Sequence, residues 1–180
     1  MRIISGTYRG KIIHAPENLP VRPTTDFAKT ALFNIIQFKV DFDSVKLLDL
    51  FAGTGNISYE FLSRGSTDIT CVDINQSCIS FIRETFLKLK FEKAKVYRSE
   101  VFRFLKDHDT QYDIIFADPP FEMKETATIP DIIFERKLLK QGGWLVVEHK
   151  SSDTLQSTIL PDEVRKYGNV GFSIYRKLKV

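Results

Sequence analysis

From about residue 44 onward, short apolar segments alternate with longer segments that have helical periodicity. The expected strands are 46–50, 69–72, 95–97, 113–117 and 144–148, and the expected helices are 57–64, 76–90, 100–106 and 126–140. Such alternation is typical of an α/β fold in which helices cover both faces of a mostly parallel sheet. Two final apolar segments, 164–167 and 172–178, surround a glycine-containing turn and predict a closing antiparallel strand pair.

Residues 1–43 follow a different pattern and predict a small extension to the main domain. Arg2–Ile4 and Gly10–Ile13 are expected to form a β-hairpin around a glycine-containing turn, and prolines then interrupt a loop. Thr25 or Asp26 is suited to cap the helix that follows. The expected apolar face of that helix includes Phe27, Ala31, Leu32 and Ile35.

The extension also holds the positive charge of the chain. The 180 residues carry 26 Lys and Arg against 23 Asp and Glu, a net charge of +3, and residues 1–40 alone hold six basic and two acidic side chains. A polyanion approached by this segment would explain the asymmetry, and a solvated basic edge would explain it equally well. The candidate phosphate contacts are Arg2, Arg9, Lys11 and Arg22.

The remaining composition excludes several classes of protein. No run approaches the roughly 18 apolar residues of a membrane span, and we expect no secretory signal. Cys71 and Cys78 form no C-x-x-C pair, and no His, Cys and Asp cluster has metal-ligand spacing. We therefore expect a cytoplasmic protein with reduced thiols, one main domain at residues 44–180, no metal and a monomeric state.

The segment Asp49–Gly55, with the sequence DLFAGTG, joins the first expected strand to a helix. Glycine lets the backbone turn sharply and lets a ligand approach its N–H groups, although such a loop is also a common plain connection. Asp73 stands 20 residues after Gly53, where a carboxylate can accept both hydroxyls of a ribose. Because Ser58 replaces a third glycine and Asp49 would repel a pyrophosphate, S-adenosylmethionine fits better than a nicotinamide dinucleotide.

The segment Ile114–Phe121 ends an apolar run with a carboxylate, two prolines and an aromatic ring. The prolines fix φ, so the carbonyls of Asp118 and Pro119 can be held outward. Phe121 offers a flat face on which a base can stack. These groups predict a site for an amino group on a planar ring, because acceptors on its N–H bonds aim the nitrogen lone pair at a methyl group. A proline-stiffened loop with a buried aromatic residue is the alternative.

If the first and fourth strands flank the point where strand order reverses, the glycine loop and Asp118 face one crevice. Together, these motifs resemble a class I S-adenosylmethionine-dependent methyltransferase, and more narrowly the bacterial 16S rRNA guanine-N2 methyltransferase family. The segments that carry the resemblance are 2–11, 22–26, 32–34, 49–55, 62–65, 118–121 and 167–176. The Asp-Pro-Pro-Phe turn is shared with DNA amino methyltransferases, whereas the block RPTTD at 22–26 is more specific.

The resemblance implies a Rossmann-like fold with a seven-stranded sheet and a role for each matching residue. It implies a cofactor site of Asp49, Phe51, Gly53, Gly55, Asp73, Glu100, Val101, Thr24 and Thr25. In that site, Asp49 and the glycines line the methionine end, Asp73 holds the ribose, and Glu100 with the Val101 N–H faces the adenine. The residues implied to meet the target base are Asp118, Pro119 and Phe121. The chain departs from the family at Phe27, Lys29 and Thr30, where two Arg and a Glu usually follow Asp26.

The leading hypothesis is therefore methyl transfer from S-adenosylmethionine to the exocyclic N2 amine of a guanine in small-subunit rRNA. The expected partner is the rRNA itself or the small ribosomal subunit. N6-adenine or N4-cytosine methylation of DNA would use the same chemistry and stays open as an alternative. A non-catalytic RNA-binding assembly factor is a third possibility.

Overall fold

A computed structural model describes residues 1–17, 19 and 25–178. The strands are β1 (Lys46–Leu50), β2 (Asp68–Asp73), β3 (Lys95–Arg98), β4 (Tyr112–Ala117), β5 (Leu139–Lys150), β6 (Glu163–Tyr167) and β7 (Val170–Arg176). The α-helices are α1 (Asp26–Ile36), α2 (Asn56–Arg64), α3 (Gln76–Lys88), α4 (Val101–Asp107) and α5 (Ile129–Glu135), and a 3₁₀ helix, η1 (Lys124–Thr128), precedes α5.

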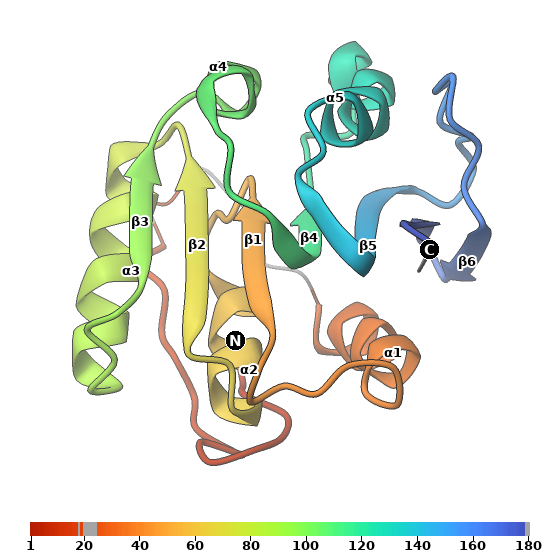
Figure 1. Cartoon of the computed structure of the whole chain (residues 1–180). Coiled ribbons are helices and arrows are strands. Elements are labelled where there is room, and N and C mark those ends of the chain that lie inside the picture. Colours follow the sequence, from red (N-terminus) through yellow and green to blue (C-terminus); the bar gives the residue numbers. More distant parts are fainter. Residues whose placement is uncertain (18, 20–24, 179–180) are drawn as a thin grey trace.

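The strands form one seven-stranded sheet in the order β3-β2-β1-β4-β5-β7-β6 (Figure 1). The pairs from β3 to β5 are parallel, whereas β7 runs antiparallel to both β5 and β6. The chain adds strands outward from β1 to β3, then returns to the middle and builds the other half from β4. This confirms the predicted fold, and it places the reversal of strand order between β1 and β4.

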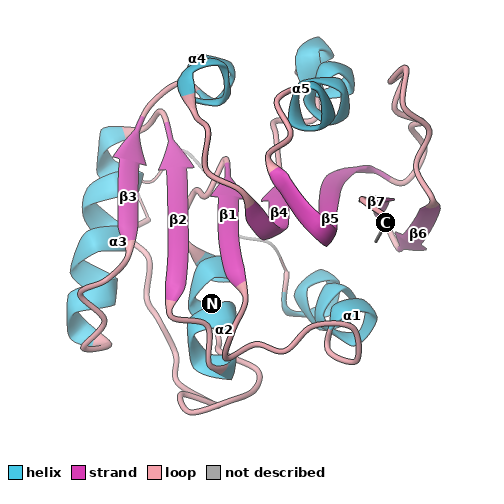
Figure 2. Ribbon diagram, in the orientation of Figure 1, coloured by secondary structure: helices cyan, strands magenta, loops and turns pink. Residues whose placement is uncertain are grey.

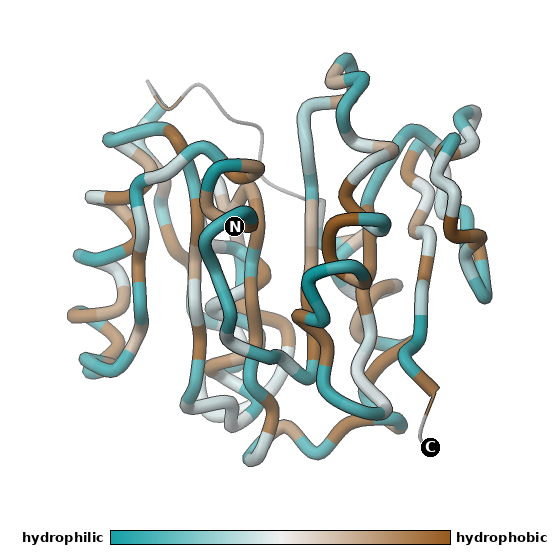
Figure 3. The backbone as a smooth tube through the Cα atoms, turned by 45° about the horizontal axis from the view of Figure 1, so that its top comes forward, coloured by the Kyte–Doolittle hydropathy of each residue, from teal (hydrophilic) through white to brown (hydrophobic). Residues whose placement is uncertain are grey.

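Helices cover both faces of the sheet, as the alternating pattern predicts. One apolar cluster joins α1, α2 and α3 to the sheet, and a second cluster joins α4 and α5 to the opposite face. In Figure 2, α4 and α5 lie at the top of the view, and α1 and α2 lie at the bottom. Figure 3 shows hydrophobic residues along the inner strands and hydrophilic residues in many of the connecting loops.

Strand β5 differs from its expected range, because it begins at Leu139 rather than Trp144. The expected helix 126–140 is replaced by η1 and the short helix α5, which ends at Glu135. Lys137 then takes a left-handed conformation with φ 57°. The helix cannot continue through that residue, so the chain turns early and Leu139 pairs with Tyr112 of β4.

The N-terminal hairpin is present but minimal. A single antiparallel bridge joins Arg2 to Ile12, with hydrogen bonds from Ile3 N to Lys11 O and from Ile13 N to Met1 O. The turn of the hairpin lies directly on α2, where a Cβ added at Gly6 would stand 1.7 Å from the carbonyl oxygen of Ser63. Ile3 and Ile13 belong to the same apolar cluster as α1 and α2, and the proposed division at residue 43 stays a prediction.

Helix α1 begins as predicted, and all the residues of its expected apolar face except Phe27 are buried or partly buried. Thr25 is its N-cap, and its hydroxyl oxygen accepts a hydrogen bond from Ala28 N at 3.2 Å. The buried face is centred on Ala28, Leu32 and Ile36. Phe27 lies outside that face and is 66% exposed, so its predicted place in the core is wrong.

Candidate functional site

The loop between β1 and α2 is shaped by three residues with positive φ. Phe51, Gly53 and Gly55 have φ values of 60°, 54° and 76°. Gly55 is also packed tightly, since an added Cβ would lie 2.7 Å from the Tyr59 ring. The glycines therefore meet a steric need of the loop, and they start α2 at the carboxyl edge of the sheet.

Asp73 connects this loop to the end of β2. Its Oδ2 accepts a hydrogen bond from Gly53 N at 2.8 Å, and its Oδ1 accepts one from Asn75 N at 2.8 Å. Each carboxylate oxygen has a second lone pair that can accept a ribose hydroxyl. Asp73 thus braces the glycine loop from the place where the sequence predicts ribose binding.

Asp49 lies one residue before the end of β1 and is only 1% exposed. The Ser58 hydroxyl donates a hydrogen bond to its Oδ2 at 2.6 Å, so the residue at the third-glycine position orients this carboxylate. Burial raises the pKa of Asp49 to about 7; the Ser58 hydrogen bond opposes this shift, and the charges of Asp118 and Asp73 add to it. A bound cation would reverse the shift by favouring the ionised form.

Asp118 follows β4 directly and stands beside the end of β1. Leu50 pairs with Ala117, and Asp118 N donates to Leu50 O at 3.3 Å. The sequence analysis required β1 and β4 to flank the reversal of strand order if the glycine loop and Asp118 were to lie together, and they do flank it. The structure brings Asp49, Asp73 and Asp118 to one edge of the sheet, and their roles stay predictions.

The Asp-Pro-Pro-Phe turn forms one wall of a pocket of about 240 Å³. Pro119, Pro120 and Phe121 line it together with Glu148 of β5 and residues of η1. The Phe121 ring is 43% exposed, and the Lys150 ammonium lies 5.9 Å from its centroid. A flat, accessible ring at the rim of a pocket suits the predicted stacking role.

Glu148 is a pocket residue that the sequence reasoning missed. It is 4% exposed, and its Oε2 has no hydrogen-bond partner in the part of the chain that the structure describes. Burial first, and the charge of Asp118 second, raise its pKa to about 9. A glutamate at the carboxyl end of the apolar run 144–147 was the available signal, because such a charge is costly to bury without a purpose.

The predicted adenine contacts serve as a helix cap. Glu100 is the N-cap of α4, and its two carboxylate oxygens accept from Phe102 N at 2.9 Å and Arg103 N at 2.7 Å. Val101 is the first residue of α4, where a backbone N–H has no acceptor within its own helix. Glu100 and Val101 therefore keep their cofactor roles as predictions.

The structure describes only some of the predicted residues of the extension. Thr24 and Arg22 lie outside the described residues, while Thr25 caps α1. The other candidate phosphate contacts, Arg2, Arg9 and Lys11, are exposed on the hairpin. Their RNA-binding role stays a prediction.

Lys29 is buried in an ion network that joins the extension to α2. Its ammonium donates to Arg2 O at 2.6 Å and to Asn56 Oδ1 at 2.8 Å, and it lies 3.6 Å from Glu60 Oε2. Burial lowers the pKa of Lys29, while the charge of Glu60 acts in the opposite direction. Lys29 thus connects the hairpin to the first residue of the helix that follows the glycine loop, and it is not available to RNA.

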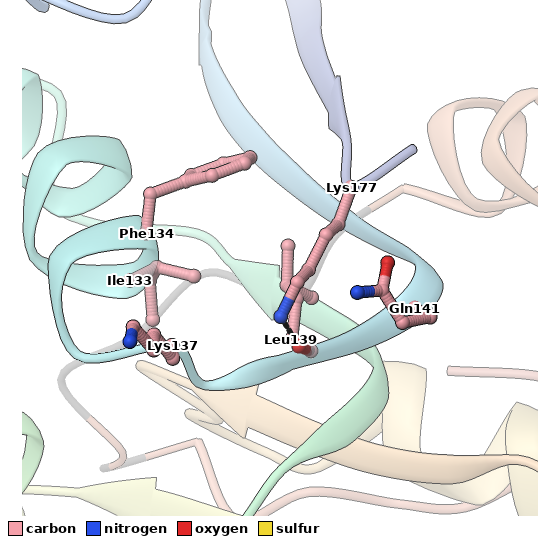
Figure 4. Close-up of a pocket in the computed structure, with 6 residues that line it drawn as sticks. All are labelled: Ile133, Phe134, Lys137, Leu139, Gln141 and Lys177. Atoms are coloured by element: carbon pink, nitrogen blue, oxygen red, sulfur yellow. Dashed lines mark hydrogen bonds between the residues drawn. The ribbon is translucent and has the colours of Figure 1, made fainter. Parts of the chain in front are cut away.

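A second, larger pocket of about 410 Å³ lies away from these residues. Figure 4 shows its lining side chains, Ile133, Phe134, Lys137, Leu139, Gln141 and Lys177. It lies at the start of β5, the opposite edge of the sheet from Asp118, and its described lining contains no carboxylate, hydroxyl or thiol. The chemistry therefore points to the smaller pocket.

Within the described ranges 1–17, 19 and 25–178, no group of three or more His, Cys, Asp or Glu side chains is placed to hold a metal ion. The same part of the chain contains no helix that is both long and apolar enough to cross a bilayer.

Comparison with known proteins gives matches along nearly the whole chain. A family model described as conserved hypothetical protein 95 matches residues 1–176. YlbH of Bacillus subtilis, proposed by its name to be an rRNA methyltransferase, is 34% identical and covers 98% of this chain and 99% of its own. Ribosomal RNA small subunit methyltransferase D of Escherichia coli K12 is 33% identical over 82% of this chain and 71% of its own.

Solved structures agree on the fold. The Escherichia coli protein yhhF, proposed by its name to be a methyltransferase, has a TM-score of 0.85 and 26% identity, covering 100% of this chain and 99% of its own. An RNA methyltransferase of Salinibacter ruber, in complex with S-adenosyl-L-homocysteine, has a TM-score of 0.66 over 88% of this chain and 95% of its own. At 13% identity, this second likeness is one of fold alone.

Proposed function

The chain belongs to the family of conserved hypothetical protein 95, and on that premise we propose that it methylates the N2 amine of a guanine in small-subunit rRNA. Relatives named as rRNA methyltransferases support the coarser activity, S-adenosylmethionine-dependent rRNA methylation. The observation that carries the proposal is the position of Asp118. This carboxylate follows β4 at the reversal of strand order, near buried Asp49 and directly before the prolines and the aromatic ring that line a pocket.

The methyl donor is S-adenosylmethionine, whose sulfonium supplies a methyl group activated for transfer to a nucleophile. The residues at the ends of β1 and β2 fit this molecule. Asp49 is a buried carboxylate that an ammonium group would complete, and Asp73 offers lone pairs to a ribose. The N-terminus of α2 adds backbone donors that favour a carboxylate.

Asp118 acts on the nucleophile. The exocyclic amine of guanine is a poor nucleophile because its lone pair is delocalised into the ring. When Asp118 and the carbonyl of Pro119 accept its N–H bonds, the nitrogen becomes more tetrahedral and the lone pair is aimed at the methyl group. As the N–C bond forms, the S–CH3 bond of the donor would break and release S-adenosylhomocysteine. The nitrogen becomes positive, the Asp118 carboxylate stabilises that charge, and the extra N–H proton is then lost to water.

The transfer is direct and uses no covalent intermediate on the protein. Cys71 is fully buried beside Ser58, with 3.1 Å between the Ser58 Oγ and the Cys71 Sγ, and its thiol pKa is raised by burial. A thiol in that state is a poor nucleophile. Reaction on ribosomal RNA also implies a cytoplasmic location, and we expect the protein to act as a monomer.

The test is methyl transfer from labelled S-adenosylmethionine, with the methylated nucleosides identified by mass spectrometry. Unmodified small subunits, free small-subunit rRNA and duplex DNA are the three substrates. We expect N2-methylguanosine in a ribosomal sample only, and at least a 1,000-fold lower rate with Asp118→Ala, because both the positioning and the charge stabilisation are lost.

Cofactor affinity of Asp118→Ala should stay within about threefold of wild type, because the residue meets the target base. Methyladenine or methylcytosine in DNA would contradict the proposed substrate and keep the chemistry. Absence of S-adenosylmethionine binding by calorimetry would instead favour a non-catalytic assembly factor. Full activity of Asp118→Ala would overturn the role given to this carboxylate.

A further inference from the structure

Glu148 differs from the other buried carboxylates of the molecule. Asp49 receives a hydrogen bond from Ser58, and Asp73 receives two from backbone N–H groups. Glu148 Oε2 is fully buried yet has no partner among the described residues. Leaving such an atom unpaired costs free energy, and each such group in a native structure calls for an explanation.

The surroundings of Glu148 indicate what would pair with it. The residue lines the same pocket as Pro119 and Phe121, and the charge of Asp118 contributes to its raised pKa. Strands β4 and β5 are parallel neighbours, with Ala117 paired to Val147, so Asp118 and Glu148 follow the paired residues on adjacent strands. A base whose amine meets Asp118 would therefore present the neighbouring part of its ring edge to Glu148.

The three amino bases differ at that part of the edge. Next to its amine, guanine carries a ring N1–H donor and then the O6 acceptor. Adenine carries the N1 acceptor and then a C–H group, whereas cytosine carries the N3 acceptor and then the O2 acceptor. Guanine alone places a ring donor beside the reacting amine.

We propose that Glu148 reads this edge: its carboxyl group accepts a hydrogen bond from guanine N1–H while Asp118 engages the N2 amine, and so selects guanine over adenine and cytosine. The inference rests on the proposed function and assigns a specificity-determining residue to the same site. Adenine and cytosine are rejected because of the free-energy cost of leaving a buried polar group unpaired. A base without the N1–H leaves the carboxyl group buried and unpaired, and unpaired polar groups give large discrimination.

The preference holds in both protonation states of Glu148. An ionised carboxylate is an acceptor only, so it accepts from guanine N1–H and repels the ring acceptor of adenine or cytosine. A neutral carboxyl group has one donor and one acceptor. It matches the N1–H and O6 pair of guanine with two hydrogen bonds, whereas adenine offers one and cytosine opposes an acceptor to an acceptor.

The experiment compares guanine with 2-aminopurine at the methylated position. This analogue keeps the amine and lacks both the N1–H and O6. The position is first mapped in the wild-type assay, and the analogue is then introduced by ligation of a synthetic rRNA segment, in free rRNA or in reconstituted small subunits, whichever the wild type methylates. The values of kcat/KM on both substrates are measured for wild type, Glu148→Ala, Glu148→Gln and Glu125→Gln.

We expect wild type to prefer guanine by at least about tenfold. Glu148→Ala should lose most of its guanine activity and little of its 2-aminopurine activity, so that the preference falls to within about threefold. Glu148→Gln retains one donor and one acceptor and should keep an intermediate preference. Glu125→Gln makes the same chemical change on an exposed carboxyl group of η1 and should keep the wild-type preference.

Comparing preferences between proteins cancels the different reactivity of the two amines. Equal loss on both substrates, or an unchanged preference in Glu148→Ala, would overturn the inference, because a purely structural role lowers both rates together. Calorimetry of S-adenosylmethionine binding confirms that each variant is folded. A wild-type protein that forms no N2-methylguanosine at all would refute the proposed function itself, which separates that failure from this one.

Discussion

Glu60 and Glu148 are both buried glutamates, and only Glu60 has hydrogen-bond or charge partners for both of its carboxylate oxygens. Glu60 is 0% exposed and accepts hydrogen bonds from Ile4 N at 2.8 Å, Ser5 N at 3.0 Å and Arg64 Nε at 3.0 Å, while the Lys29 ammonium lies 3.6 Å away. Glu148 is 4% exposed and keeps a buried oxygen without a partner in the described chain.

The difference separates a carboxylate that stabilises the fold from carboxyl groups to which we assign a ligand. The partners of Glu60 are two backbone N–H groups and two cations, which is what a buried charge needs to be tolerated. Asp49 and Glu148 have raised pKa values instead, because burial is only partly compensated or not compensated at all. Incomplete solvation at such groups is typical of functional sites.

The largest expected effect is the loss of stability when Glu60, the fully paired carboxylate, is removed. Glu60→Ala should lower the free energy of unfolding by about 3–5 kcal/mol, because it leaves the Lys29 charge and two backbone donors buried with fewer partners. Urea denaturation monitored by circular dichroism measures this. Glu84→Ala, which removes an exposed pair with Lys88, is the control and should cause no measurable change. A loss below about 1 kcal/mol for Glu60→Ala would contradict the comparison.

Replacing Asp49 is expected to increase the stability of the protein, whereas replacing Glu60 decreases it. Its pKa rises from 3.8 in an unfolded chain to about 7 in the folded one, so stability is lost as the pH rises from about 4 to 7. Asp49→Asn should therefore stabilise the cofactor-free protein by on the order of 2 kcal/mol at pH 8, and by little at pH 4. The same variant should bind S-adenosylmethionine at least 100-fold more weakly, because it lacks the charge for the ammonium.

Urea denaturation at both pH values tests the stability change, and calorimetry tests the affinity. A variant that is less stable than wild type at pH 8 would show that the Asp49 carboxylate is satisfied in the folded protein. Unchanged affinity would remove Asp49 from the cofactor site.

A smaller effect is expected in the pH dependence of S-adenosylmethionine binding, which reports the ionisation of Asp49. An ammonium ligand requires ionised Asp49, so the affinity of wild type for S-adenosylmethionine should rise about tenfold per pH unit below pH 7 and level off above pH 8. Calorimetry between pH 5.5 and 8.5, in two buffers with different ionisation enthalpies, should also detect proton release. The slope should disappear in Asp49→Asn; its persistence there would assign the titration to another group.

The smallest effects are expected at fully solvated charges. If Arg9 and Lys11 contact rRNA phosphates, Arg9→Gln and Lys11→Gln should each reduce the slope of log affinity against log salt by about one. Fluorescence anisotropy with labelled small-subunit rRNA at several salt concentrations measures that slope. Lys106→Gln changes an exposed lysine on α4, across the sheet from the hairpin, and should leave the slope unchanged. Equal slopes for all three variants would show that the basic hairpin is a solvated surface that does not contact rRNA phosphates.

Most of the fold was predictable because each of the first four strands is short and has an apolar segment bounded by polar residues. β1 to β4 match their expected ranges within one residue at each end. The first half of β5 was not predictable, since Lys140, Gln141 and two glycines break the apolar pattern and the helical periodicity of the preceding segment extends to residue 140. The exposed position of Phe27 shows a similar limit, because hydrophobicity alone does not tell which face of a helix is covered.

The site was predictable where a carboxylate ends an apolar strand. Asp49, Asp73 and Asp118 all carry that signal, and parallel strands bring their carboxyl ends to one edge. Glu148 carries the same signal, yet no motif drew attention to it. The partnership of Lys29 with Glu60 could not be read from the sequence, because it depends on how the extension packs against α2.

The docking of the hairpin on α2 has a consequence for how the chain is made. Ser5 and Ser63 are joined by a hydrogen bond across 58 residues, Ile4 reaches Glu60 across 56, and Tyr8 reaches Leu89 across 81. During translation, the hairpin leaves the ribosome well before any of these partners has been synthesised. Ile3 and Ile13 therefore stay exposed on the nascent chain until α2 emerges, so the first residues to be translated cannot reach their final place before residues 56–64 have followed them.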